Sequence, residues 1–428
     1  MLLLVVSVAI AGPIEPSITR MGNGLTVILL EDHSAELVGV DVWVRAGSRF
    51  ETAKNSGVSH FIEHLLFGAT NKRKPGDMDR EMESLGATLD AHTTSDYAHF
   101  NTTVSSRYLV KALDVFADAM HSSLFREEDI KKERLVILDE IARKQTKPMS
   151  VCRDMLAKSL YGEHAYALPW EGTRETVNSI TRDEILAYFH AYYVPSNMAV
   201  VLVGDFDKQS AITEIGRAFQ GLQGPAPTDK ASGDIPRPTK QITVSAKAPY
   251  DSSYLAIGYL GPPGADYQDV CATDVLLTYL GVGYRSWLSD ELKTKLGLAG
   301  DGSADFVTEH GPGLISIIVP ASSANLSRAR DAILAKIESI KTGGISDADL
   351  SRAKRSLLGQ AAFQKETVGG LANTLGFYFA VSDPSFAGKY TECVQSVSGD
   401  DIKRVAGKYL DPGAAVIAMI GPDQEVSK

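Results

Sequence analysis

The sequence has few cysteines and no apolar run long enough to cross a membrane, and each absence excludes a class of protein. Cys152, Cys271 and Cys393 are the only cysteines among 428 residues, and they form no C-x-x-C pair. Such an odd and sparse set cannot build a disulfide framework or a cysteine zinc cluster, so buried, inert thiols are expected. The only long apolar run, residues 1–11, is too short to span a bilayer as a helix.

Basic residues are also fewer than acidic residues. The chain has 43 Lys and Arg against 53 Asp and Glu, a net charge of −10, which argues against nucleic acid as the main partner. With 44% hydrophobic and 22% charged residues, the composition is that of an ordinary globular protein. The length allows two or three domains, each with its own core.

The first twelve residues have features of an export signal. Residues 1–11 read MLLLVVSVAIA and end in the small-x-small pattern Ala9-Ile10-Ala11, as before a secretory cleavage site. The expected basic start is missing, so residues 1–12 are interpreted as a signal-peptide remnant, with an N-terminal arm as the alternative. Export predicts a periplasmic or secreted protein.

Strand and helix patterns alternate along the chain and predict an α+β fold built from α/β sandwiches. Strands are expected within 24–48, 87–104 and Met198–Val203, and helices near 55–70, 76–85, 107–121, 127–146 and 181–191.

A Pro- and Gly-rich stretch, 221–239, predicts a linker between domains covering 13–220 and 240–428. Residues 181–206 match residues 398–423 without gaps, with Pro195 over Pro412 and Gly204 over Gly421. This indicates two homologous halves. Convergent helix-turn-strand patterning is the alternative.

The sharpest signal is His60-Phe61-Ile62-Glu63-His64. On a helix these spacings place two imidazoles and a carboxylate on one side. The neighbouring residues are apolar, and a metal ion would relieve the cost of burying three such polar groups. H-x-x-E-H is the inverted order of the zincin motif, and it requires a third zinc ligand from elsewhere. Core histidines bonded to the backbone are the alternative.

The candidate segment for the third ligand is 132–141. Glu133 and Glu140 are seven residues apart, two turns along one helix face, within a helix that also carries Val136, Ile137 and Ile141. Inward carboxylates need a compensating charge. A solvated acidic stripe is the alternative, since Lys131, Lys132 and Arg134 are adjacent.

With these motifs the chain resembles the M16 metallopeptidases, and in size and duplication the B subfamily that includes mitochondrial processing peptidases. The family ligand Glu follows H-x-x-E-H by 76 residues, at Glu140 here, and its supporting Glu falls on Glu133. The blocks 47–51, 192–206 and 420–422 also look like family blocks. The resemblance implies two homologous halves of the LuxS/MPP-like metallohydrolase fold.

The resemblance also implies roles. His60, His64 and Glu140 would ligate one Zn²⁺ per chain, Glu63 would be the general base, and Glu133 would orient a ligand histidine. Substrate would add as a strand to Asp90, Ala91 and His92. Relatives usually have Asn at the Asp90 position and His92 is unusual, so His92 as an extra ligand stays open.

The second half lacks the zinc motif, with Cys271, Asp274 and Val275 at the positions of His60, Glu63 and His64. Active relatives carry there an Arg and, seven residues on, a Tyr that bind substrate and stabilise the oxyanion. Lys293 and Gly300 occupy these positions, and loss of one oxyanion donor typically costs a factor of about 10²–10³ in rate. Either the chain is a poor enzyme alone, or a homologous subunit supplies the pair.

The sequence therefore predicts a zinc endopeptidase acting on unfolded peptides enclosed in a chamber, as a heterodimer or otherwise a homodimer. For such an endopeptidase, presequence processing and peptide turnover are the two alternative functions. An export signal favours peptide turnover. The alternative from another class is a non-catalytic, core-protein-like structural subunit. Such relatives usually lose the zinc residues, which this chain retains.

Overall fold

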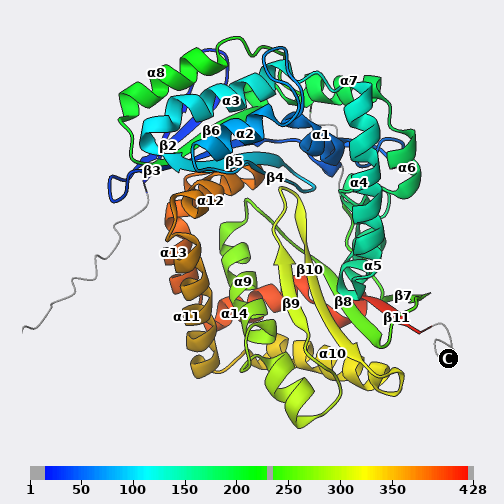
Figure 1. Ribbon diagram of the computed structural model, residues 1–428. Helices are drawn as coiled ribbons and strands as arrows, with labels where there is room; N and C mark the ends of the chain where they lie inside the picture. The colour runs from blue at the N-terminus through cyan, green and yellow to red at the C-terminus, as the bar shows by residue number, and fades with distance from the viewer. Residues whose placement is uncertain (1–14, 229–234, 423–428) are drawn as a thin grey trace, which may run out of the picture.

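Two sandwiches of one sheet and its covering helices make up the molecule (Figure 1). The computed structural model describes residues 15–228 and 235–422. The expected signal remnant, 1–12, and residues 229–234 of the expected linker lie outside these ranges. Within them, no helix is both long enough and apolar enough to cross a membrane.

Apart from the additional edge strand β1, the two sheets have the same strand order, and this confirms the predicted fold class. The N-terminal sheet runs β1-β2-β6-β3-β5-β4 and the C-terminal sheet β7-β11-β8-β10-β9. In both, one neighbouring pair is parallel (β2 with β6, β7 with β11) and the other pairs are antiparallel. The strands are β1 (Ser17–Arg20), β2 (Thr26–Glu31), β3 (Leu37–Val44), β4 (Asp90–Thr93), β5 (Ala98–Ser105), β6 (Met198–Gly204), β7 (Ile242–Lys247), β8 (Ser253–Pro263), β9 (Ser303–Val307), β10 (Pro312–Ala321) and β11 (Val416–Gly421).

The helices follow the predicted positions, usually with shorter bounds. Those of the N-terminal half are α1 (Val58–Leu66), α2 (Asp77–Ser84), α3 (Leu109–Ser122), α4 (Glu127–Gln145), α5 (Pro148–Tyr161), α6 (Arg174–Ser179), α7 (Arg182–Tyr192) and α8 (Lys208–Phe219). Those of the C-terminal half are α9 (Tyr267–Gly281), the π-helical segment η5 (Leu288–Lys295), α10 (Leu326–Gly343), α11 (Asp347–Gln364), α12 (Val368–Val381), α13 (Phe386–Ser396) and α14 (Gly399–Tyr409).

The aligned ends of the two halves adopt the same local structure. A capping box opens α7 at Thr181 and α14 at Ser398, so an N-cap hydroxyl and the residue three positions on satisfy each other's backbone N–H groups. Pro195 and Pro412 then begin short 3₁₀ turns that lead into β6 and β11. Together with the shared strand order, this repetition supports duplication over convergent patterning.

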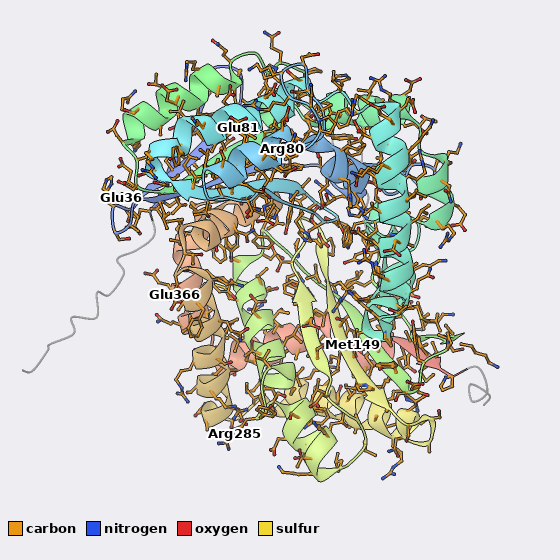
Figure 2. All side chains as sticks on the ribbon, in the orientation of Figure 1. Glu36, Arg80, Glu81, Met149, Arg285 and Glu366 are labelled. Carbon is orange, nitrogen blue, oxygen red and sulfur yellow. A yellow bond between two sulfur atoms is a disulfide. The ribbon has the colours of Figure 1, made fainter. Side chains whose placement is uncertain are left out.

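One helix of each half packs on the sheet of the other half. Helix α5 packs on β8, β10 and β11, whereas α12 packs on β3, β5 and β6. The α12 contact needs glycine, because a Cβ at Gly376 would lie 2.0 Å from the Trp43 ring. At the α5 contact, a Cβ at Gly258 would lie 2.9 Å from the Leu156 side chain, which would have to shift. Figure 2 shows Met149, at the start of α5, beside the C-terminal strands. The two halves therefore share their hydrophobic cores.

The expectation of three inert thiols is wrong for two of them. Cys271 on α9 and Cys393 on α13 form a disulfide, with their Cα atoms 6.2 Å apart. They are separated by 122 residues in sequence, and only the packing of α13 against α9 brings them together. Cys152 is free and buried in α5, as expected.

Candidate metal centre

Helix α1 carries the H-x-x-E-H motif and is fixed at its start by a buried carboxylate. Glu51 accepts hydrogen bonds from the backbone N–H of Gly57 (2.7 Å) and of Ser59 (2.8 Å), which otherwise have no partner in the first helical turn. Gly57 has φ +94, and a Cβ there would lie 2.7 Å from the Glu171 carbonyl oxygen. Only glycine fits this approach, so the sequence Gly57-Val58 sets where α1 begins.

The apolar side of α1 anchors the motif in the N-terminal core. Phe61, Ile62 and Leu66 are fully buried there, together with residues of the N-terminal sheet and of α3 and α7. The remaining side of the helix presents His60, Glu63 and His64 toward α4, which packs against α1. The burial of one side thus orients the polar groups on the other.

Three potential ligand atoms converge between α1 and α4. His60 Nε2 lies 3.2 Å from His64 Nε2, and Glu140 Oε2 lies 3.6 Å and 3.4 Å from these two nitrogens. Among the described residues, His60, His64 and Glu140 are the one group of this kind able to hold a metal ion, and His92 is not a member of it. The carboxylate of Glu140 on α4 therefore points toward the two histidines and is not part of a solvated acidic stripe.

Burial favours the neutral, ligand-competent form of His60, and a hydrogen bond orients the ring of His64. Burial, with a smaller contribution from the nearby His64, lowers the pKa of His60 to about 3, so the His60 ring is neutral at physiological pH. His64 Nδ1 lies 3.3 Å from Glu133 Oε2. Because Glu133 accepts from Nδ1–H, the lone pair of His64 falls on Nε2, facing the other two ligand atoms.

These atoms fit a zinc ion. Zn–N and Zn–O bonds of about 2.0–2.1 Å in tetrahedral geometry place neighbouring ligand atoms about 3.3 Å apart, close to the 3.2–3.6 Å found. Without a cation, two nitrogen lone pairs and a carboxylate oxygen would face each other at these distances. Three protein ligands also leave a fourth position open, as in catalytic rather than structural zinc sites.

Glu63 lies between the two histidines in sequence but is not one of the three converging ligands. Burial raises the pKa of its carboxyl, and the neighbouring Thr93 hydroxyl and His64 ring lower it by less. A carboxylate whose pKa is raised toward neutrality is better matched to taking up and releasing a proton.

Trp170 is a site residue that sequence analysis missed. Its ring packs edge-on against His60, with centroids 5.0 Å apart, and lies 5.9 Å from the His92 ring. A cavity of about 600 Å³ begins at Glu140 and is lined by Trp170 and by residues of α4 and α5. Trp170 lies in a loop without periodicity, so the sequence carried no signal for it.

The strand expected to receive substrate is at an edge. β4 is the last strand of its sheet, and Asp90 and His92 on it are exposed while Ala91 is half-buried. One side of β4 pairs with β5, which leaves the other free for an added strand. Strand β4 also contacts α1, so a peptide paired there would run beside the metal-ligand group.

Both halves of the chain hold the turn between β4 and β5. Asp96 accepts a hydrogen bond from the Tyr166 hydroxyl (2.8 Å) and one from the backbone N–H of His310 (2.7 Å), and it pairs with Arg49 (2.8 Å). His310 belongs to the β9–β10 connection of the C-terminal half. The C-terminal half therefore helps to fix the edge strand beside the metal-ligand group.

Comparison with known proteins decides the family. The profile described as insulinase, peptidase family M16, matches residues 26–174, and the profile described as the peptidase M16 inactive domain matches residues 179–357. The chain belongs to the M16 peptidase family. Its metal-ligand group falls within the first matched region, and the second region covers much of the half without the motif.

Relatives of similar length support the M16 assignment. The chain is 28% identical to an uncharacterized zinc protease of Streptomyces coelicolor, over 96% of this chain and 91% of that protein. It is 26% identical to the probable mitochondrial-processing peptidase subunit beta of Arabidopsis thaliana, over 96% and 79%. The crystal structure of a protease from Helicobacter pylori shares the fold, with a TM-score of 0.91, 24% identity, and coverage of 96% and 100%.

In the M16 inactive region, α9 takes the place of α1. It packs against α11 and β9 as α1 packs against α4 and β4. Cys271 is used in the disulfide, and Asp274 accepts a hydrogen bond from the Tyr390 hydroxyl (2.7 Å). Among the described residues, the group able to hold a metal ion lies in the N-terminal half.

Lys293 and Gly300 lie in the C-terminal half, away from the metal-ligand group of the same chain. Lys293 is on η5 and pairs with Asp301 at 2.5 Å, while Gly300 donates its backbone N–H to Pro320. Arg285, three residues before η5, is at the opposite end of the molecule from α1 (Figures 1 and 2). Substrate contact through Lys293 stays a prediction, and it would require a second subunit.

Proposed function

We propose that this chain is a zinc-dependent endopeptidase that hydrolyses unfolded peptides, with one Zn²⁺ held by His60, His64 and Glu140. The observation that carries the proposal is the convergence of three ligand atoms within 3.2–3.6 Å beside the buried carboxyl of Glu63. The similarity of the chain to proteins named as zinc proteases supports it.

The residues around the ion would divide the work of peptide hydrolysis. When bound, zinc would polarise the scissile carbonyl and make a water easier to deprotonate. Glu63 takes the proton from that water and then passes it to the departing amine. Glu133 keeps the His64 ring in the tautomer that presents Nε2, and strand β4 aligns the peptide by backbone hydrogen bonds.

A second, homologous subunit is part of the proposal. Gly300 has no hydroxyl and Lys293 has no planar guanidinium, so this chain lacks the Arg and Tyr that active relatives use. A partner carrying them would complete the site, and the naming of a similar protein as a subunit of a processing peptidase supports this arrangement. A homodimer is the simpler alternative.

We place the protein in a periplasm or outside the cell. The apolar segment 1–11 resembles an export signal, and the Cys271–Cys393 disulfide fits an oxidising compartment. In such a compartment, turnover of peptides is favoured over presequence processing.

The absent oxyanion pair favours one other function, a structural subunit without catalysis. In that case the His60, His64 and Glu140 group need not bind zinc or contribute to activity. Zinc content and peptidase activity together distinguish this function from the one proposed.

The test measures both quantities for the purified chain, alone and mixed with a homologous subunit that carries the Arg and Tyr. Glu63→Gln should keep zinc and abolish cleavage of a quenched fluorescent peptide. Asp139→Asn is the charge-matched control, because Asp139 is 67% exposed on α4 and pairs only with Arg143 among the described residues; it should keep both. A chain that binds no zinc, or stays inactive with the partner, would refute the proposal.

A further inference from the structure

The C-terminal half contains a cavity at the place that corresponds to the zinc group. It has a volume of about 390 Å³ and is formed between α9, α11, α12, α13 and the end of β9. We call it the C-terminal cavity. Glu366 in Figure 2 marks the α11–α12 connection beside it. Its size is at the lower end of the range of cavities that hold small molecules.

One wall of the cavity presents a carboxyl without a cation. Asp274 has one hydrogen bond among the described residues, from the Tyr390 hydroxyl to Oδ2 at 2.7 Å, and no ion pair is found for it there. Burial raises the pKa of this carboxyl to about 7. A buried carboxylate is costly unless a positive charge compensates for it, so the site is suited to an ammonium group.

Another wall presents a cation without an anion. Lys365, just after α11, lines the cavity, and none of the ion pairs within the described ranges includes it. Burial lowers its pKa. Lys365 and Asp274 line the same cavity and form no ion pair with each other, so both charges are available to one ligand that carries the two opposite charges.

The rest of the lining consists of apolar, amide and hydroxyl side chains. Phe306, Phe377 and Tyr378 supply aromatic surface, whereas the side chains of Gln360 and Asn373 are exposed at the rim. Aromatic faces attract ammonium groups and bury apolar side chains. Opposite charges with aromatic walls are complementary to an amino acid that carries both charges and an apolar side chain.

We propose that the C-terminal cavity binds a free amino acid with a large apolar side chain, its ammonium at Asp274 and its carboxylate at Lys365. Free amino acids form when further peptidases degrade the peptides that an endopeptidase releases, so this site would sense the end product of complete peptide turnover. Binding at this cavity does not require activity at the zinc group.

The first test uses three probes on the full-length, zinc-loaded protein by isothermal titration calorimetry. L-phenylalanine carries both charges, N-acetyl-L-phenylalanine lacks the ammonium and L-phenylalanine amide lacks the carboxylate. We expect each blocked probe to bind about tenfold or more weakly than L-phenylalanine. Equal binding of all three, or no binding of L-phenylalanine up to about 10 mM, would overturn the proposal.

The second test assigns each charge to its residue. In Asp274→Asn, L-phenylalanine and the N-acetyl probe should bind alike, and in Lys365→Met, L-phenylalanine and the amide should bind alike. Lys389→Met, an exposed lysine on α13, is the control and should keep the wild-type ranking. If folded Asp274→Asn and Lys365→Met also keep the wild-type ranking of the three probes, the assignment is wrong. If Asp274→Asn does not fold, Tyr390→Phe provides a milder change at the same carboxyl.

A last comparison separates this inference from the proposed function. Glu63→Gln should bind L-phenylalanine as the wild type does, because Glu63 is in the other half. Binding by an inactive protein would leave the cavity proposal standing when the peptidase proposal fails. Loss of binding in Glu63→Gln would count against an independent site.

Discussion

Replacing Glu133 should weaken zinc binding without removing a ligand. Glu133 holds the His64 ring through an Nδ1–Oε2 contact of 3.3 Å, which is longer than the 2.7–2.9 Å typical of a charge-assisted hydrogen bond. The carboxylate is 20% exposed and also lies 3.6 Å from Lys132 Nζ. Partners of this kind typically change metal affinity by 10- to 100-fold, and the long, shared contact places Glu133 at the lower end.

Two substitutions at this position separate charge from tautomer. Glu133→Gln keeps an oxygen that can accept from His64 Nδ1–H and loses only the charge, so we expect about a tenfold weaker zinc affinity, about 1.4 kcal/mol. Glu133→Ala also releases the ring and should weaken zinc affinity further, by about 30-fold. Glu140→Gln, which removes the carboxylate ligand, should bind zinc more weakly than either Glu133 variant.

The assay is competition for zinc with a chelator of known affinity, followed at constant pH. Glu128→Gln is the matched control, since Glu128 is on the same helix, 71% exposed, and pairs with Arg126. A Glu133→Ala protein that is folded and binds zinc within about twofold of the wild type would refute the assigned role. Loss equal to that of Glu140→Gln would instead make Glu133 a direct ligand.

Three further predictions concern stability. Glu51→Ala leaves the N–H groups of Gly57 and Ser59 without their acceptor and should lower the free energy of unfolding by about 3 kcal/mol in urea; an unchanged midpoint would contradict the capping role. Asp274 takes up a proton on folding between pH 3.8 and about 7, so wild-type stability should fall as pH rises through that window, and less so in Asp274→Asn; identical pH profiles would show that the carboxyl is not protonated on folding. Cys393→Ser should unfold about 3–5 kcal/mol more easily than the oxidised wild type and be insensitive to reductant; a reductant-insensitive wild type would mean that the disulfide does not form.

The metal-ligand group could be predicted from sequence because its main signal is local. Two histidines four residues apart share a helix face by geometry alone, and the family spacing added Glu140. Trp170 and the Asp96 contacts could not be predicted in this way, because they depend on how distant segments pack. The aligned ends of the halves were also predictable, since capping residues and proline act on their immediate neighbours.

Which helix packs on which sheet could not be predicted from the sequence in the same way. The sequence patterns of α5 and α12 do not show which sheet covers each helix. The same limit applies to Cys271 and Cys393, whose pairing depends on the packing of α13 on α9. Sequence patterns describe the surface that each element buries, whereas the partner is chosen by the whole fold.

The exchange of α5 and α12 means that neither half is a self-sufficient protein. A chain cut within residues 221–239 would leave the C-terminal sheet without α5 and the N-terminal sheet without α12, each with an apolar face open to water. Separate fragments should therefore aggregate, while fragments produced together can cover each other's sheets and assemble. A gene of this kind could be divided in two only if both products were always made together.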